Sequence, residues 1–345
     1  MTFDPNAATH ITSEPKPTAS LASGVGAGRR GRKFGAAVLG VAALATVGAF
    51  AGATASRAGA AVLTNCAAAP SRCGYPDATN TGVPAGTALK SVPSQVSSGP
   101  GWSWNAAYGE VIVKGNGTVL SGLSVAGTID IQASNVTVKN DRVVTGGTFA
   151  ISLRHTTGVT IENSTISGQD STTGRVNQAI ADVYCDSTGL VIKDNNISDF
   201  RTGIMFVTGL VEGNYIHDPG YIAGDHTNGI TAVGTTEPLT IKDNTVLNDL
   251  GQTDAITLNA SGPGQAVANK TVTGNFLAGG DYTIYGGAGS NDPTSNIVIT
   301  NNRFGQAYSP KCGQYGPVAV FDSTGTGNAW SGNIWDTTGK AVPSP

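Results

Sequence analysis

The segment from residue 217 to residue 230 contains the densest set of groups that could perform acid–base chemistry. It holds two of the four histidines, His217 and His226, close to Asp225 and Asn228. Imidazole and carboxylate groups transfer protons near neutral pH when their surroundings adjust their pKa values. The segment also contains Pro and Gly, so an ordinary turn is the alternative interpretation.

Two later segments end on a small residue followed by isoleucine and can be aligned with this one. In the alignment Asn228 lies against Asp254, and Arg201 from an earlier segment shares the register of Asp281. We therefore predict that these groups converge over about four neighbouring strands, roughly 15 Å. The predicted catalytic residues are His226, Asp254, Asp225 and Arg201. The predicted substrate-binding residues are Asp281, Tyr282, Asn228 and Tyr285.

Asn228 and Asp254 also have a purely structural interpretation. Two positions before a buried isoleucine, a regular strand turns its side chain inward, so both residues would extend a polar ladder beneath a turn. A neutral amide cannot act as a general base, which leaves Asp254 as the candidate base of the two. The sequence leaves both interpretations open.

The composition restricts the class of protein. The 345 residues include 48 Gly and 16 Pro, only 12% are charged, and the mean hydropathy is −0.03. So many turn formers and so few charges argue against a helical bundle or coiled coil. At a net charge of −3 the chain has no basic field for a phosphate backbone, so we expect no nucleic-acid partner.

The first 60 residues have the order of an export signal. A cationic run at 29–33 is followed by an uncharged stretch at 34–53 and by two Ala-x-Ala patterns. An uncleaved single-span anchor is the alternative. In either case we expect the rest of the chain to lie outside the cytoplasm, secreted and free of the membrane once the signal is cleaved.

A short pattern recurs from residue 138 onward: an apolar residue, two polar residues, Asn or a substitute, any residue, and a second apolar residue. A small residue followed by an apolar one alternates with it. The Asn position is occupied by Asp141, Ser164, Asn195, Asn214, Asn244, Asn275, Asn302 and Asn333. The apolar residues of the second element are Ile151, Ile180, Ile204, Ile230, Ile256 and Ile284, with Val320 expected next.

This repeat predicts an all-β fold, a parallel β-helix. Each coil would contribute short strands that pair with the coils on either side, so equivalent residues stack about 4.8 Å apart. The apolar residues would stack inside, and the Asn side chains would form a buried ladder at a turn. Tandem β-sandwiches are the alternative, but they need hairpin turns that the repeat does not supply.

On this repeat, residues 106–345 resemble the pectin-lyase-like superfamily of right-handed parallel β-helix proteins. Residues 75–84 are similar to the leader of secreted bacterial members, in which a start segment caps the first coil. The resemblance implies that residues 61–105, with Trp102 and Trp104, form this cap. The stretch ending at Ile230 is similar to a His-Thr-Asp-Gly-Ile segment of some secreted β-helix proteins, with Asn228 in place of the Asp.

The long insertions all follow the Asn position, so they should leave the solenoid at one corner and build a wall beside a strand face. Such a groove suits an extended polysaccharide, and we expect the protein to act on it as a monomer. Two carboxylates could hydrolyse a glycosidic bond. Alternatively, a base could remove a proton beside a uronate whose charge is neutralised by Arg, Lys or calcium. The candidate calcium ligands are Asp225, Asp254 and Asp281.

The four cysteines form an even number, which in an exported chain indicates disulfides. Cys66 and Cys73 are the predicted pair. Cys185 and Cys312 lie about five coils apart, roughly 24 Å, so they could pair only if the loop at 305–319 folded back along the wall. Otherwise they would be two free thiols.

We therefore predict a secreted carbohydrate-active β-helix protein, a polysaccharide lyase or a related glycan-cleaving enzyme. The alternative is a non-catalytic extracellular β-helix that binds glycans or presents a stable surface. The predicted organisation is an export segment at 1–60, a capping segment at 61–105 and a β-helix domain at 106–345.

Overall fold

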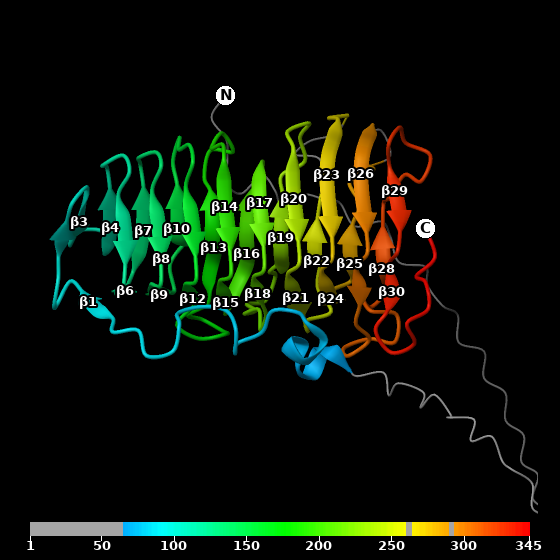
Figure 1. Ribbon diagram of the computed structural model, residues 1–345, viewed down its shortest axis with the longest axis horizontal. Helices are drawn as coiled ribbons and strands as arrows, with labels where there is room; N and C mark the ends of the chain where they lie inside the picture. Colours follow the sequence, from blue (N-terminus) through cyan, green and yellow to red (C-terminus); the bar gives the residue numbers. More distant parts are fainter. Residues whose placement is uncertain (1–64, 260–263, 290–292) are drawn as a thin grey trace, which may run out of the picture. The chain divides into compact units, whose positions relative to one another are not determined.

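The structure is a computed structural model that describes residues 65–259, 264–289 and 293–345. The predicted export segment at 1–60 lies outside these residues. Three long sheets run through the described body, and each coil passes through sheet B, then sheet C, then sheet A (Figure 1). The predicted parallel β-helix is confirmed. In the part of the chain that is described, no helix is long and apolar enough to cross a membrane.

The strands of the three sheets have the following bounds. Sheet A contains β1 (Lys90–Val92), β6 (Leu123–Ala126), β9 (Arg142–Val144), β12 (Thr165–Ser167), β15 (Asn196–Ser198), β18 (Tyr215–Ile216), β21 (Thr245–Asn248), β24 (Phe276–Gly279), β27 (Arg303–Phe304) and β30 (Ile334–Trp335). Sheet B contains β2 (Ser98–Gly99), β3 (Trp102–Asn105), β4 (Glu110–Val113), β7 (Thr128–Ile131), β10 (Phe149–Leu153), β13 (Val176–Asp182), β16 (Phe200–Phe206), β19 (Asn228–Ala232), β22 (Asp254–Thr257), β25 (Tyr282–Tyr285) and β28 (Gly316–Ala319). Sheet C contains β5 (Val119–Ser121), β8 (Thr137–Lys139), β11 (Thr160–Glu162), β14 (Leu190–Lys193), β17 (Gly209–Glu212), β20 (Leu239–Lys242), β23 (Val267–Thr273), β26 (Thr294–Thr300) and β29 (Ala329–Ser331).

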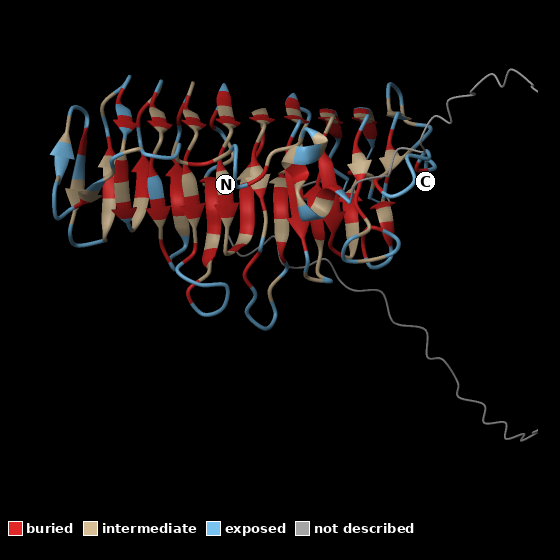
Figure 2. Cartoon of the chain, turned by 60° about the horizontal axis from the view of Figure 1, so that its bottom comes forward, coloured by how far each residue is buried: buried red, intermediate tan, exposed pale blue. Residues whose placement is uncertain are grey.

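The core is a stack of apolar residues that repeats from coil to coil, and the buried positions follow the strands while exposed ones gather in the loops (Figure 2). In sheet B the predicted isoleucine row is confirmed. Its last member is Val318, which pairs with Ile284. The prediction of Val320 is wrong: β28 begins opposite Tyr282, so the chain reaches the inward position two residues earlier and Val320 is exposed.

The small residue before each isoleucine also points inward. A Cβ added to Gly229 would approach Val246 Cγ1 of sheet A at 2.4 Å, and Ala255 is buried in the core. Two successive inward residues form a local bulge, and only a small side chain fits there. The residue before the bulge therefore points outward. The inward parity expected of Asn228 and Asp254 holds only for a regular strand, and this strand is not regular.

The predicted asparagine ladder is confirmed at the corner between sheets C and A. From Asn195 to Asn333, each backbone N–H donates to the next side-chain Oδ1 at 2.9–3.0 Å. Each Nδ2 donates to that same Oδ1 at 2.9–3.1 Å. The residue before each ladder position has a left-handed backbone, which Gly, Asn and Asp tolerate best. These residues are Asn140, Asn163, Asp194, Gly213, Asp243, Gly274, Asn301 and Gly332.

Asp141 begins the ladder with a carboxyl group in place of an amide. Its Oδ1 accepts a hydrogen bond from Leu123 N at 2.7 Å, whereas Oδ2 has no partner among the described residues. Burial raises the pKa of Asp141 to about 7, although backbone N–H groups oppose the shift. A protonated Asp141 therefore resembles the amide that occupies the later coils.

Residues 65–89 form a strap across the outside of sheet A, and the strap follows the coils in reverse order (Figure 1). At the last coil, Cys66 N donates to Asp336 Oδ2 at 3.0 Å. Further along, Val83 N donates to Thr165 Oγ1 at 3.1 Å. The strap then enters β1, which pairs with β6, and β2 and β3 cover the first coil through the antiparallel pairing of β3 with β4.

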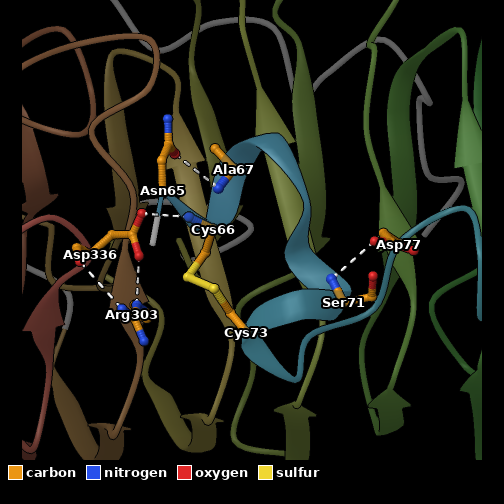
Figure 3. Close-up of a disulfide and its surroundings, with 8 residues drawn as sticks. All are labelled: Asn65, Cys66, Ala67, Ser71, Cys73, Asp77, Arg303 and Asp336. Carbon is orange, nitrogen blue, oxygen red and sulfur yellow. Dashed lines mark hydrogen bonds and ion pairs between the residues drawn. A yellow bond between two sulfur atoms is a disulfide. The ribbon is translucent and has the colours of Figure 1, made fainter. Parts of the chain in front are cut away.

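The predicted disulfide between Cys66 and Cys73 is confirmed and lies in the first turn of the strap, between η2 (Cys66–Ala68) and η3 (Pro70–Cys73) (Figure 3). Cys185 and Cys312 are free thiols. The 305–315 loop folds back by one coil only, because Gly279 N donates to Cys312 O at 3.2 Å.

We expect Asn244→Ala to lower the free energy of unfolding by about 3 kcal/mol, because it leaves several buried backbone groups unpaired. The side chain of Asn177 makes no hydrogen bond in the described structure, so Asn177→Ala is the matched control and should change stability by less than about 1 kcal/mol. Urea unfolding followed by circular dichroism measures both. Equal effects would contradict the ladder's role.

We expect Asp141→Asn to reduce the dependence of stability on pH. The carboxyl pKa is about 7 when folded and 3.8 as the reference for the unfolded chain, so the unfolded chain releases its proton first as pH rises. The contribution of Asp141 to the free energy of unfolding is therefore fully present below about pH 4. It decreases by roughly 4 kcal/mol as the pH rises to about 7. In urea titrations, the free energy of unfolding of the variant should rise by that amount relative to wild type between pH 4 and pH 8. Parallel plots of this free energy against pH would refute the assignment.

Candidate functional site

The outer face of sheet B carries two rows of side chains, one on each side of the bulge. The row before the bulge contains Gln178, Thr202, Asn228 and Asp254. The row after it contains Ala181, Met205, Thr231, Thr257 and Tyr285. The rows are in contact, since Gln178 Nε2 lies 3.4 Å from Met205 Sδ. The bulge thus brings polar groups from both sides of the isoleucine onto one surface.

Asp254 is the most strongly perturbed group on this face. Its side chain is fully buried, and neither carboxyl oxygen has a hydrogen-bond partner among residues 65–259, 264–289 and 293–345. Burial raises the pKa of Asp254 well above its usual range, and the charge of Asp281 raises it further. An unpaired carboxylate is very unfavourable in such surroundings, so burial favours the protonated form of Asp254.

Asp281 and His226 continue from Asp254 toward solvent. Asp281 is half-buried; burial raises its pKa, and the neighbouring His226 opposes the shift. Its backbone is fixed, since Asp281 N donates to Thr253 O at 3.0 Å and Asp281 O accepts from Tyr315 N at 2.8 Å. The imidazole of His226 is exposed. Exposure therefore increases along these three side chains: the carboxyl of Asp254 is buried, that of Asp281 is half-buried, and the imidazole of His226 is exposed.

Three tyrosines lie next to these groups. The rings of Tyr282 and Tyr285 meet edge to face at 5.7 Å, and Tyr315 packs at 5.8 Å from Tyr282. Tyr315 is 54% exposed. Burial, followed by the charges of Asp254 and Asp281, raises the pKa of Tyr285. The cluster offers apolar ring faces and hydroxyl groups together, a combination that suits a sugar ring.

Asp225 fixes the wall beside this face. It accepts two hydrogen bonds from Arg175, at 2.5 Å from Nε and 2.6 Å from Nη2, and a third from Ile222 N at 2.8 Å. The ion pair joins two loops between sheets A and B, at 169–175 and 217–227. Asp225 therefore holds the two insertions together, and both its oxygens are engaged.

Arg201 lies beside this ion pair. Its Nε is buried and has no hydrogen-bond partner within the described ranges. Burial lowers its pKa; Asp225 opposes this shift and Arg175 adds to it. Because Asp225 is already paired with Arg175, the charge of Arg201 is not neutralised by a direct ion pair in this part of the chain. Arg201 thus places a cation at the edge of the face.

The structure divides the predicted site residues between the face and the wall. Asp254, Asp281, His226, Tyr282 and Tyr285 lie together at the face. Asn228 pairs in register with Asp254, and its Nδ2 donates to His226 O at 3.2 Å. Asp225 and Arg201 lie at the wall. Among the described residues, no group of three or more His, Cys, Asp or Glu side chains is arranged to hold a metal ion.

Two functional residues escaped the sequence analysis. Arg175 ends one insertion and meets Asp225 from another, 50 positions later, and no local pattern links them. Tyr315 comes from the 305–315 loop, whose path over β25 depends on backbone contacts such as Gln314 N to Gly280 O at 2.8 Å. Their only sequence signal is their position within long insertions at the corner between sheets A and B.

A hollow of about 220 Å³ lies at the same corner, between the loops at 249–253 and 305–315. Asp249, Tyr308 and Gln314 contribute to its lining. Gly280 also lines it and packs against the backbone of Asp254. The predicted site residues do not line this hollow, so the candidate site is the open surface of sheet B beside it.

The comparison with known protein families agrees with this architecture. A family model described as "Right handed beta helix region" matches residues 121–304, more than half of the chain. No curated protein and no solved structure matches the chain. The matched range covers the ladder from Asp141 to Asn302, the loops at 169–175 and 217–227 and the tyrosines on β25. The chain belongs to the family of right-handed β-helix proteins.

Proposed function

We propose that this protein is exported and acts on an extended polysaccharide laid across the outer face of sheet B. The observation that carries the proposal is the spatial order of three side chains: Asp254, Asp281 and His226 lead from the buried interior of the face to solvent. Neighbouring titratable groups whose environments differ in this way are typical of acid–base sites. The adjacent tyrosine rings supply a surface for sugars.

In this proposal Asp281 and His226 contact the polysaccharide and transfer protons. Burial raises the pKa of Asp281, which favours the protonated form that a general acid needs. Asp254 is a positioning residue: it lies behind Asp281, and its fully buried side chain does not contact the polysaccharide. Tyr282 and Tyr315 hold the sugar ring against these groups.

Two reactions are compatible with these roles. Hydrolysis uses one group as acid toward the leaving oxygen and another as base toward water. Elimination removes a proton beside a uronate carboxylate, and Arg201 would then neutralise that carboxylate. The resemblance to pectin-lyase-like proteins favours a polysaccharide lyase or a related glycan-cleaving enzyme.

A non-catalytic glycan-binding protein is the second candidate. It is favoured by the complete burial of Asp254 and by the engagement of Asp225 with Arg175. In that case the tyrosines and Arg201 would bind sugars without any bond being cleaved.

The test is to incubate the full-length protein with pectate, alginate and neutral polysaccharides, each with and without a chelator. Absorbance of unsaturated ends reports elimination, and new reducing ends without that absorbance report hydrolysis. We expect cleavage, and we expect Asp281→Asn and His226→Gln each to lower its rate by about 100-fold or more, the usual contribution of a general acid or base.

Asp322→Asn is the matched control, because Asp322 is a carboxylate that caps a turn through Thr324 and lies outside the site. It should keep full activity. Retardation in polysaccharide gels without any product would support the binding protein instead. Absence of both binding and cleavage on all these polymers would overturn the proposal.

A further inference from the structure

A second cluster of polar groups lies on the same face of sheet B, in the first coils. Asp130 on β7 pairs in register with Ser152 on β10, and their row continues through Ala181 and Met205 to Tyr285. Tyr282 and Tyr285 of the candidate site lie on β25, five strands beyond β10. This separation is about 24 Å at the spacing of neighbouring strands. The two clusters are therefore distinct regions of one surface.

Asp130 organises this cluster. Its side chain is 4% exposed and accepts hydrogen bonds from Ser152 Oγ at 2.5 Å, Arg154 Nε at 2.5 Å and Gln132 Nε2 at 2.6 Å. The inner edge of the Arg154 guanidinium is thus fixed, while the side chain as a whole stays 32% exposed. A guanidinium held along one edge presents its remaining N–H groups in a set direction.

Tyr184 supplies an aromatic surface beside Arg154. Its ring is stacked on His155, with centroids 4.2 Å apart and planes 9° apart, and Arg154 Nη1 lies 3.5 Å from its hydroxyl. His155 Nδ1 is 2.5 Å from Asp186 Oδ2, which fixes the supporting imidazole. Tyr184 is nevertheless 45% exposed. An aromatic ring supported from below but open to solvent is well suited to pack against a ligand ring.

The charges of the cluster favour an uncharged ligand. Arg154 is compensated by Asp130, and Glu110 and Asp186 are further carboxyl groups nearby. Burial and the charge of Asp130 raise the pKa of Glu110, while Arg154 opposes them. A carboxylate or sulfate would therefore meet no excess of positive charge. Fixed donors on Arg154, acceptors on Glu110 and the Tyr184 ring match the hydroxyl groups and apolar face of a neutral sugar.

We propose that Arg154, Tyr184 and Glu110 form a second sugar-binding site, which holds an uncharged sugar unit of the same polysaccharide. The inference rests on the proposed function, since it assigns the far end of the same ligand. Tyr184, after β13, and Tyr282 on β25 are separated by four strand spacings, about 19 Å, and also by six positions along the strand direction, so the two rings are roughly 25 Å apart. A pyranose unit is about as long as one strand spacing, so a chain of about six units contacts both sites.

The test measures affinity as a function of oligosaccharide length. The probes are cello-, xylo- and galacto-oligosaccharides of about two to eight units, with oligogalacturonates as an acidic series. Calorimetric titrations use the full-length protein with Asp281→Asn, which slows cleavage by about 100-fold or more. For at least one neutral series we expect the affinity to rise up to about six units and then to level off.

Tyr184→Ala, added to that protein, should lower the affinity for six units about tenfold and leave the affinity for two units unchanged. Tyr184→Phe should retain the original affinity, because the ring remains. Tyr108→Ala is the matched control, since Tyr108 is a 79% exposed tyrosine in the loop between β3 and β4. It should change neither affinity.

The second site is refuted if neutral oligosaccharides bind but Tyr184→Ala matches the parent at every length, or weakens all lengths equally. It is also refuted if only oligogalacturonates depend on Tyr184. Absence of binding to every series and to the polysaccharides themselves would instead contradict the proposed function.

Discussion

The whole fold depends on one hydrogen-bonded column, the asparagine ladder between sheets C and A. Each side-chain amide accepts from the coil before it and donates to the coil after it, so a slip of one residue would break several buried bonds at once. The left-handed residue before each ladder position turns the chain sharply into sheet A. Because this corner is fixed, side chains far apart in sequence become neighbours on the other sheets.

The outer faces of the three sheets differ in how far they are covered and in how far their polar side chains are paired. Sheet A is covered by the strap. On sheet C, charged side chains of neighbouring coils pair with each other, as Lys193 does with Glu162 at 3.0 Å and Lys242 with Glu212 at 2.7 Å. Sheet B carries buried polar atoms without partners in the described structure, including those of Asp254, together with exposed tyrosines. It is therefore the face on which perturbed polar groups and exposed rings lie together.

The sequence predicted the repeating parts of the structure well, because each coil shows the same pattern. The ladder and the isoleucine row follow directly from residues such as Asn244 and Ile256. The outward direction of Asp254 did not follow, because the bulge depends on a second inward residue that only packing reveals. The partner of Asp225 could not be predicted either, since Arg175 reaches it through a loop contact between coils. Periodic packing is encoded locally, whereas contacts between insertions are not.

The strap has a consequence for the order in which the molecule assembles. Its first described residues bind the final coil, through Cys66 and the Asp336 carboxylate that also pairs with Arg303 at 2.6 Å. The strap is synthesised before the coils. The surface that it binds is therefore incomplete until the coil that carries Asp336 has been synthesised. Coil stacking can proceed as the chain lengthens, but closure of the strap must wait for the coils that carry Arg303 and Asp336. A polypeptide truncated by a single coil would consequently lose an attachment point at its opposite end.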